Sequence, residues 1–107
     1  MTTPFVSTLR ARRETLRVGA PGDGALSLRV EMPELWDVVR VEAAPEAPVL
    51  ALKTAALAAL DPRADPANFV MKLRGIEVLD ESQPLSASGA IDGSIFLLTH
   101  RRRRPVR

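Results

Sequence analysis

Few side chains of this sequence could take part in chemistry, and they gather at its carboxyl end. His100 is the only histidine, and four consecutive arginines follow it: Arg101, Arg102, Arg103 and Arg104. No carboxylate or nucleophile is spaced so as to work with His100 in acid–base catalysis. We therefore expect a surface histidine, no catalytic residues and no enzyme activity.

Metal-bound and thiol chemistry have no support in the sequence either. The chain has no cysteine, which excludes disulfides, thiolate zinc sites and a cysteine nucleophile. Its acidic residues are scattered, without the spacing of a metal-binding loop. The sequence therefore predicts neither a metal site nor a cofactor.

The arginine run points to an acidic partner or to none. Such a run attracts phosphates with an affinity that falls as salt rises, but no aromatic residue is interleaved for base stacking. The body of the chain, residues 26–99, holds six basic against eleven acidic residues and lies between two basic ends. We leave three interpretations open: a solvated basic tail, contact with an acidic protein or membrane surface, and nucleic-acid binding.

The length of 107 residues allows one small domain with some tail. A glycine-rich segment at 19–24 marks a boundary. We predict an N-terminal basic extension or leader over 1–25, a domain over 26–100 and an arginine-rich tail over 101–107. The first of these is open to three forms: a leader, an extra strand or an extra helix. No apolar stretch is long enough to span a membrane and no signal-peptide pattern is present, so we expect a cytoplasmic protein.

Hydrophobic patterning indicates strands on either side of one helix. A helix is predicted over Val49–Leu60, with an apolar stripe made of Val49, Leu52, Ala56 and Leu60. Strands are predicted over 26–32, 37–42, 68–73, 76–79 and 95–99. The first two form a hairpin, and residues 80–93 form a loop. This order indicates an α+β fold, a mixed sheet of four or five strands packed on one α-helix.

With these residues, the order resembles the ubiquitin-like β-grasp family over roughly residues 26–101. The helix carries Leu52-Lys53 at its middle, and "MKLRGIEVLD", "PLSASGAIDGS" and "IFLLTHR" follow it in the family's order. Within the family the chain is most similar to bacterial YukD-like proteins, which are associated with type VII secretion. The resemblance implies that the last strand lies centrally, beside the first, and that Leu85 with either Ala90 or Ile91 pins the crossing loop to the core.

The resemblance also implies a function, a non-catalytic module that docks a protein partner through an exposed sheet face. The partner-binding patch it implies consists of Trp36, Lys72, Phe96 and Leu98. Phe96 and Leu98 belong to this patch if Ile95 and Leu97 point toward the helix, because neighbours along a strand face opposite ways. Lys72 stands where the family has an exposed isoleucine. The partner could be a secretion-system component; alternatively, Phe96 packs against the N-terminal segment of its own chain.

Two other functions stay open. A ubiquitin-like modifier or carrier normally ends in Gly-Gly, and this sequence has no glycine after Gly93, which disfavours conjugation. A nucleic-acid binder would act through the basic tail, and its binding would be sensitive to salt.

Overall fold

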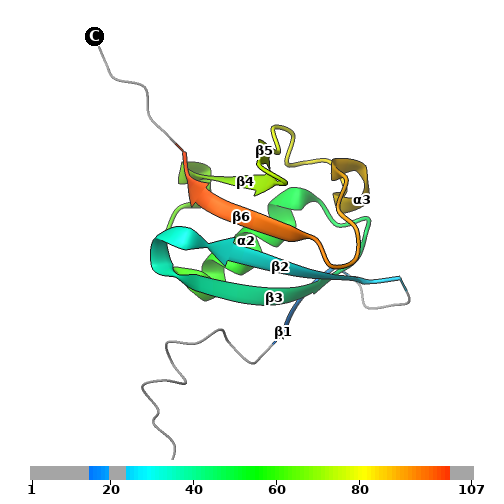
Figure 1. Cartoon of the computed structure of the whole chain (residues 1–107), viewed down its shortest axis with the longest axis horizontal. Coiled ribbons are helices and arrows are strands. Elements are labelled where there is room, and N and C mark those ends of the chain that lie inside the picture. The colour runs from blue at the N-terminus through cyan, green and yellow to red at the C-terminus, as the bar shows by residue number, and fades with distance from the viewer. Residues whose placement is uncertain (1–14, 20–23, 102–107) are drawn as a thin grey trace, which may run out of the picture.

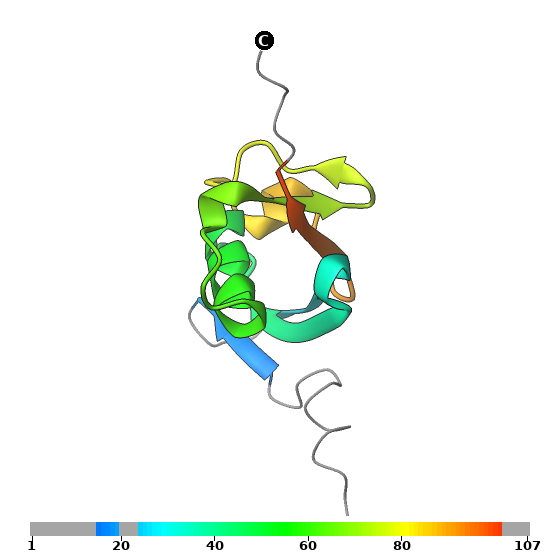
Figure 2. The same ribbon diagram turned by 90° about the vertical axis from the view of Figure 1, so that its left-hand side faces the viewer.

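A single long helix lies across one face of a curled sheet (Figures 1 and 2). The computed structural model describes residues 15–19 and 24–101. The helix is α2 (Val49–Leu60). The strands are β1 (Thr15–Val18), β2 (Leu26–Met32), β3 (Asp37–Ala43), β4 (Phe69–Leu73), β5 (Ile76–Glu77) and β6 (Ile95–His100). Three short helical turns connect them: η1 (Pro33–Leu35), η2 (Pro66–Asn68) and α3 (Leu85–Ser88).

The strand order in the sheet is β1-β3-β2-β6-β4-β5. Strand β6 lies between β2 and β4; it is parallel to β2 and antiparallel to β4. The α+β class and the central position of the last strand are therefore confirmed. The turn before β6 is tied to β2, because the Ser27 N–H donates to the Asp92 carboxylate and the Gly93 N–H donates to the Ser27 carbonyl, both at 2.7 Å. Gly93 has a φ of 91°, which favours glycine.

The sheet has six strands, one more than the largest number expected, because part of the N-terminal segment joins it. Strand β1 pairs in parallel with β3, and Val18 is buried. The turn after β1 requires a glycine, since a Cβ on Gly19 would lie 2.8 Å from the Cβ of Ala44. Of the three forms left open for this segment, residues 15–18 adopt the strand. Residues 1–14 and 20–23 lie outside the described part, and the domain limits stay a prediction.

The core lies between α2 and the inner face of the sheet. The helix stripe predicted from the sequence is confirmed: Val49, Leu52, Ala56 and Leu60 are all buried. The loop expected over 80–93 contains the short helix α3, whose Leu85 is fully buried. Ala90 is the second residue that pins this loop, whereas Ile91 is exposed.

The orientation expected for β6 is wrong. Phe96 and Leu98 are both 0% exposed and belong to the core, while Ile95 is 40% exposed. The reason is the register, which places Phe96 opposite Val30 of β2 and Leu98 opposite Met71 of β4, two residues of the inner face. Cross-strand partners share a face. Phe96 and Leu98 therefore cannot line an outer patch.

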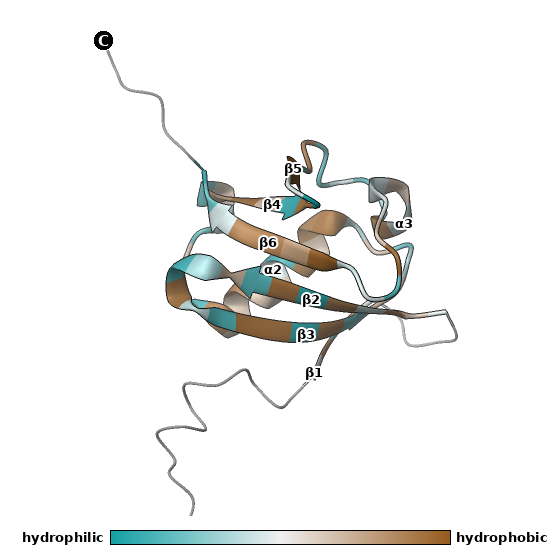
Figure 3. Ribbon diagram, in the orientation of Figure 1, coloured by the Kyte–Doolittle hydropathy of each residue, from teal (hydrophilic) through white to brown (hydrophobic). Residues whose placement is uncertain are grey.

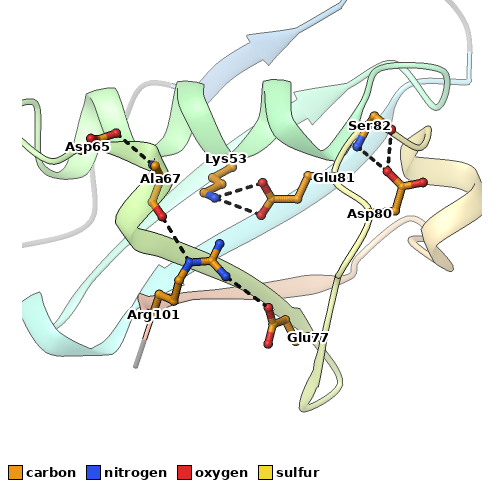
Figure 4. Close-up of polar contacts among 8 residues, drawn as sticks. All are labelled: Lys53, Asp65, Ala67, Glu77, Asp80, Glu81, Ser82 and Arg101. Atoms are coloured by element: carbon orange, nitrogen blue, oxygen red, sulfur yellow. Dashed lines mark hydrogen bonds and ion pairs between the residues drawn. The ribbon is translucent and has the colours of Figure 1, made fainter. Parts of the chain in front are cut away.

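The start of α2 is held by the segment that precedes α3. No side chain caps the helix, but the N–H groups of Val49 and Leu50 donate to the carbonyls of Gln83 and Glu81, at 3.0 and 2.8 Å. These contacts satisfy N–H groups that have no partner within the helix. Lys53 adds an ion pair: its Nζ lies 3.0 Å from each carboxylate oxygen of Glu81 (Figure 4).

The two side chains of the ion pair are unequally buried. Removing one or the other should therefore lower the free energy of unfolding by different amounts. The Lys53 side chain is 2% exposed and that of Glu81 is 19% exposed. Glu81→Ala strands a buried ammonium group and should lower the free energy of unfolding by about 3 kcal/mol. Lys53→Met frees a carboxylate that can reach water, and should stay within about 1 kcal/mol of wild type. Urea unfolding of both variants measures the difference; equal losses would contradict this account of the pair.

Candidate functional site

In the part of the chain that the structure describes, no helix covers the outer face of the sheet, opposite α2 (Figure 2). Its residues follow from strand alternation and register. On β2, β3, β4 and β6 they are Ser27, Arg29, Glu31, Val38, Arg40, Glu42, Val70, Lys72, Ile95, Leu97 and Thr99. The charged residues lie on β2, β3 and β4. The aliphatic ones are Val38, Val70, Ile95 and Leu97, of which Val70 is buried.

Ile95 and Leu97 are the aliphatic residues that β6 contributes to this face. Ile95 is 40% exposed and Leu97 is half-buried. Leu97 lies between Glu31 of β2 and Lys72 of β4, and Ile95 lies beside Arg29 of β2. These two aliphatic side chains thus form a small apolar surface flanked by Arg29, Glu31 and Lys72.

The turn between β2 and β3 carries a second exposed apolar group. Trp36 is 91% exposed and Leu35 is 46% exposed. The Trp36 backbone is left-handed, with a φ of 55°, and its N–H donates to the Pro33 carbonyl at 3.1 Å. A bulky residue in this region is strained by about 1–2 kcal/mol. The turn therefore holds the indole in water against both its hydrophobicity and its backbone preference.

The structure thus separates the four residues of the expected patch. Lys72 is on the outer face and Trp36 is at the hairpin turn, whereas Phe96 and Leu98 are in the core. Ile95 and Leu97 take the places expected for Phe96 and Leu98. Partner binding by any of them stays a prediction.

Two arginines face each other on the outer face. Arg29 of β2 and Arg40 of β3 are direct cross-strand partners, and both are exposed. The acids nearest in register are Glu31 and Glu42, but no ion pair with either arginine is found among the described residues. Like charges directly opposite each other destabilise a sheet. We call Arg29 and Arg40 the arginine pair.

The basic tail is described only at its first residue. The Arg101 N–H donates to the Asn68 carbonyl at 2.7 Å, and its Nε donates to the Ala67 carbonyl at 3.2 Å. Its guanidinium group also lies 3.9 Å from a Glu77 carboxylate oxygen (Figure 4). Arg101 is therefore bound to its own domain. Arg102, Arg103 and Arg104 lie outside the described residues, and their role stays a prediction.

His100 contacts an aromatic ring and a single carboxylate. Its ring centroid lies 4.3 Å from that of Phe69, and its Nδ1 lies 3.9 Å from a carboxylate oxygen of Glu34. Within the described ranges, no three His, Cys, Asp or Glu side chains gather to hold a metal ion. In the same ranges, no helix has the length and apolar character needed to cross a membrane.

Comparison with known proteins identifies the fold. No family model and no curated protein matches the sequence. Among solved structures, ubiquitin from Caldiarchaeum subterraneum is similar with a TM-score of 0.64 at 22% identity, over 75% of this chain and 98% of that one. The C-terminal ubiquitin-like domain of mouse tubulin-specific chaperone e gives 0.64 at 15% identity, over 81% and 98%. The ubiquitin-like domain of Plasmodium falciparum Dsk2 gives 0.62 at 18% identity, over 72% and 99%.

The arginine pair predicts a gain in stability when one of its charges is removed. Arg40→Gln should raise the free energy of unfolding by roughly 0.2–1 kcal/mol, because it relieves repulsion from Arg29. The gain should shrink in 0.5 M NaCl, where charges this close are screened. Arg63→Gln is the control, since Arg63 is exposed in a turn that also holds Asp61 and Asp65. Chemical denaturation at low and high salt measures both; a loss of stability in Arg40→Gln would contradict the repulsion.

The strand order, the single helix on one face and the likeness to these three structures lead to one conclusion: the chain has the ubiquitin-like β-grasp fold.

Proposed function

We propose that this chain is a non-catalytic protein-interaction module that docks a partner through the outer face of its sheet. The observation that carries the proposal is the position of Ile95, which is 40% exposed, and of the half-buried Leu97 on the sheet face that no described helix covers. Burying these two side chains against a partner would remove apolar surface from water, at about 25 cal/mol for each Å².

Trp36 supports the same function. Its indole is held in solvent by a strained turn, and exposed tryptophans are frequent anchors at protein interfaces. The turn η1 contacts β6, so Trp36 follows the turn that borders the strand carrying Ile95 and Leu97. A partner that spans the end of the hairpin and the outer face would engage all three side chains.

The finer parts of the proposal rest on the sequence resemblance. They are a bacterial, YukD-like protein located in the cytoplasm, with a component of a type VII secretion system as its partner. They also include contact of the arginine tail with nucleic acid or with an acidic surface. What supports these parts is the ordered set of motifs between residues 52 and 101.

Crosslinking can locate the docking surface. A photoreactive p-benzoylphenylalanine replaces Ile95 or Trp36 in one set of cells, and Thr54, exposed on α2, in another. Positions 95, on the outer face, and 36, at the hairpin turn, should yield the same crosslinked protein, which mass spectrometry identifies. Crosslinks that arise only at position 54 would place the interface on the helix and contradict the proposal.

Affinity measurements then test the residues. Leu97→Asp should raise the Kd of the purified partner by about 30-fold or more, because a charge replaces an anchor in the interface. Thr54→Asp, on the opposite face of the domain, should leave the Kd unchanged. Circular dichroism confirms that both variants fold. An unchanged Kd in folded Leu97→Asp would show that this side chain is not at the interface.

A further inference from the structure

We infer that the segment docked on the outer face is acidic: it places an Asp or Glu carboxylate on the arginine pair and packs a neighbouring aliphatic side chain on Ile95. This inference rests on the proposed docking function and adds the chemistry of the partner. It is carried by the register of three adjacent strands, by the charges around the pair and by a depression in the sheet surface.

The register places the two arginines and Ile95 in one row across the sheet. Arg40 is the cross-strand partner of Arg29, and Arg29 is the partner of Ile95. Neighbouring strands lie about 4.8 Å apart, so the row runs over two such steps. A carboxylate between the guanidinium groups could accept forked hydrogen bonds from both. The residue next to it on the partner would then reach Ile95.

A shallow depression of about 350 Å³ lies at this place. Its polar lining comes from Thr15, Ser27, Arg29, Arg40 and Glu42. The hydroxyl groups and guanidinium groups are donors that suit a carboxylate. The depression thus offers a concave polar site at Arg29 and Arg40, with Ile95 next to it in the register, rather than a flat charged surface.

The acidic neighbours limit where a carboxylate can sit. Glu42 lines the depression, but its cross-strand partner on β1 is Arg17, which offsets its charge. Glu31 follows Arg29 on the same face and is opposite Val38 and Leu97. Among the described residues, a partner carboxylate is therefore attracted most strongly between Arg29 and Arg40, and Glu31 disfavours its displacement along β2. This charge pattern favours one or two acids at a fixed place over a long acidic tract.

The same pattern favours a protein over a nucleic acid. Residues 26–99 hold eleven acidic against six basic residues, so the body of the domain repels an extended polyanion. A single carboxylate meets only the local charge of the arginine pair. The aliphatic Ile95 and Leu97 beside the pair suit a peptide side chain and offer no aromatic ring for a base.

Within the described part of the chain, no carboxylate forms an ion pair with Arg29 or Arg40. The repulsion between the two arginines therefore destabilises the free domain. A charge pair that destabilises the isolated sheet becomes favourable when a carboxylate is added between the two groups. The arrangement is therefore better suited to the complex than to the free domain.

A displayed library of random 12-residue peptides tests the inference on the full chain. The wild type should enrich peptides in which Asp or Glu is next to Leu, Ile or Val. A synthetic copy of an enriched peptide should bind the double variant Arg29→Gln, Arg40→Gln at least about tenfold more weakly, equivalent to about 1.4 kcal/mol. Arg63→Gln should bind as the wild type does. Urea unfolding checks that the double variant is folded.

A second change, in the peptide, shows whether the groups meet. Replacing the enriched acid by its amide should weaken binding to the wild type but not weaken it further in the double variant, because the interaction is already lost. Equal loss in both proteins would place the carboxylate elsewhere and overturn the inference, as would an acidic peptide that the double variant binds fully.

Two further outcomes separate this inference from the proposed function. Enrichment of uncharged apolar peptides that need Ile95 but not the arginine pair would leave the docking face intact and overturn the acidic partner. Tighter binding of a 20-base-pair DNA duplex than of any peptide, with the same dependence on Arg29 and Arg40, would overturn it in favour of nucleic acid. No enrichment at all would count against the docking face as well.

Discussion

The parallel pairing of β2 with β6 is the constraint on which the rest of the structure depends. It places Val30 opposite Phe96 and so decides which side of β6 faces the helix. Because both side chains are fully buried, a slip of one residue would expose a phenylalanine and bury Ile95 in its place. The two faces of the domain, core and outer surface, follow from this register. The turn at Asp92 and Gly93, which hydrogen-bonds to Ser27, fixes it at one end.

Much of the fold could be read from the sequence, but the orientation of the last strand could not be read from its apolar residues alone. Residues 95–98 are all apolar, and β6 shows almost uniform hydrophobic colouring up to Thr99 (Figure 3). Without alternation, periodicity does not assign a face. Thr99 was the available signal, because this polar residue points the same way as Ile95 and Leu97. Strand β1 could be given only as one of three forms for a similar reason: its two apolar residues, Leu16 and Val18, fit a strand or a helix.

The helix was predictable because its apolar stripe is periodic. The contacts that fasten it to the rest of the domain were not predictable. Lys53 stands in the middle of an apolar helix, and its partner Glu81 is distant in sequence, in a stretch expected to be a loop. That segment also accepts the first N–H groups of α2. The loop thus fastens the start of the helix on the inner side of the sheet, and no described helix lies on the outer face. On the outer face, the register that buries Phe96 also brings Ile95 next to Arg29. The pairing of β2 with β6 therefore determines both the packing of the core and the chemistry of the outer face.

Solvent access along β6 tests this register most directly. The chain has no native cysteine, so single cysteines at positions 95 to 98 can be labelled with a thiol reagent in the folded protein. Ile95→Cys and Leu97→Cys should react quickly, whereas Phe96→Cys and Leu98→Cys should react only after unfolding. Rapid labelling at 96 and 98 with protection at 95 and 97 would reverse the two faces and contradict the account.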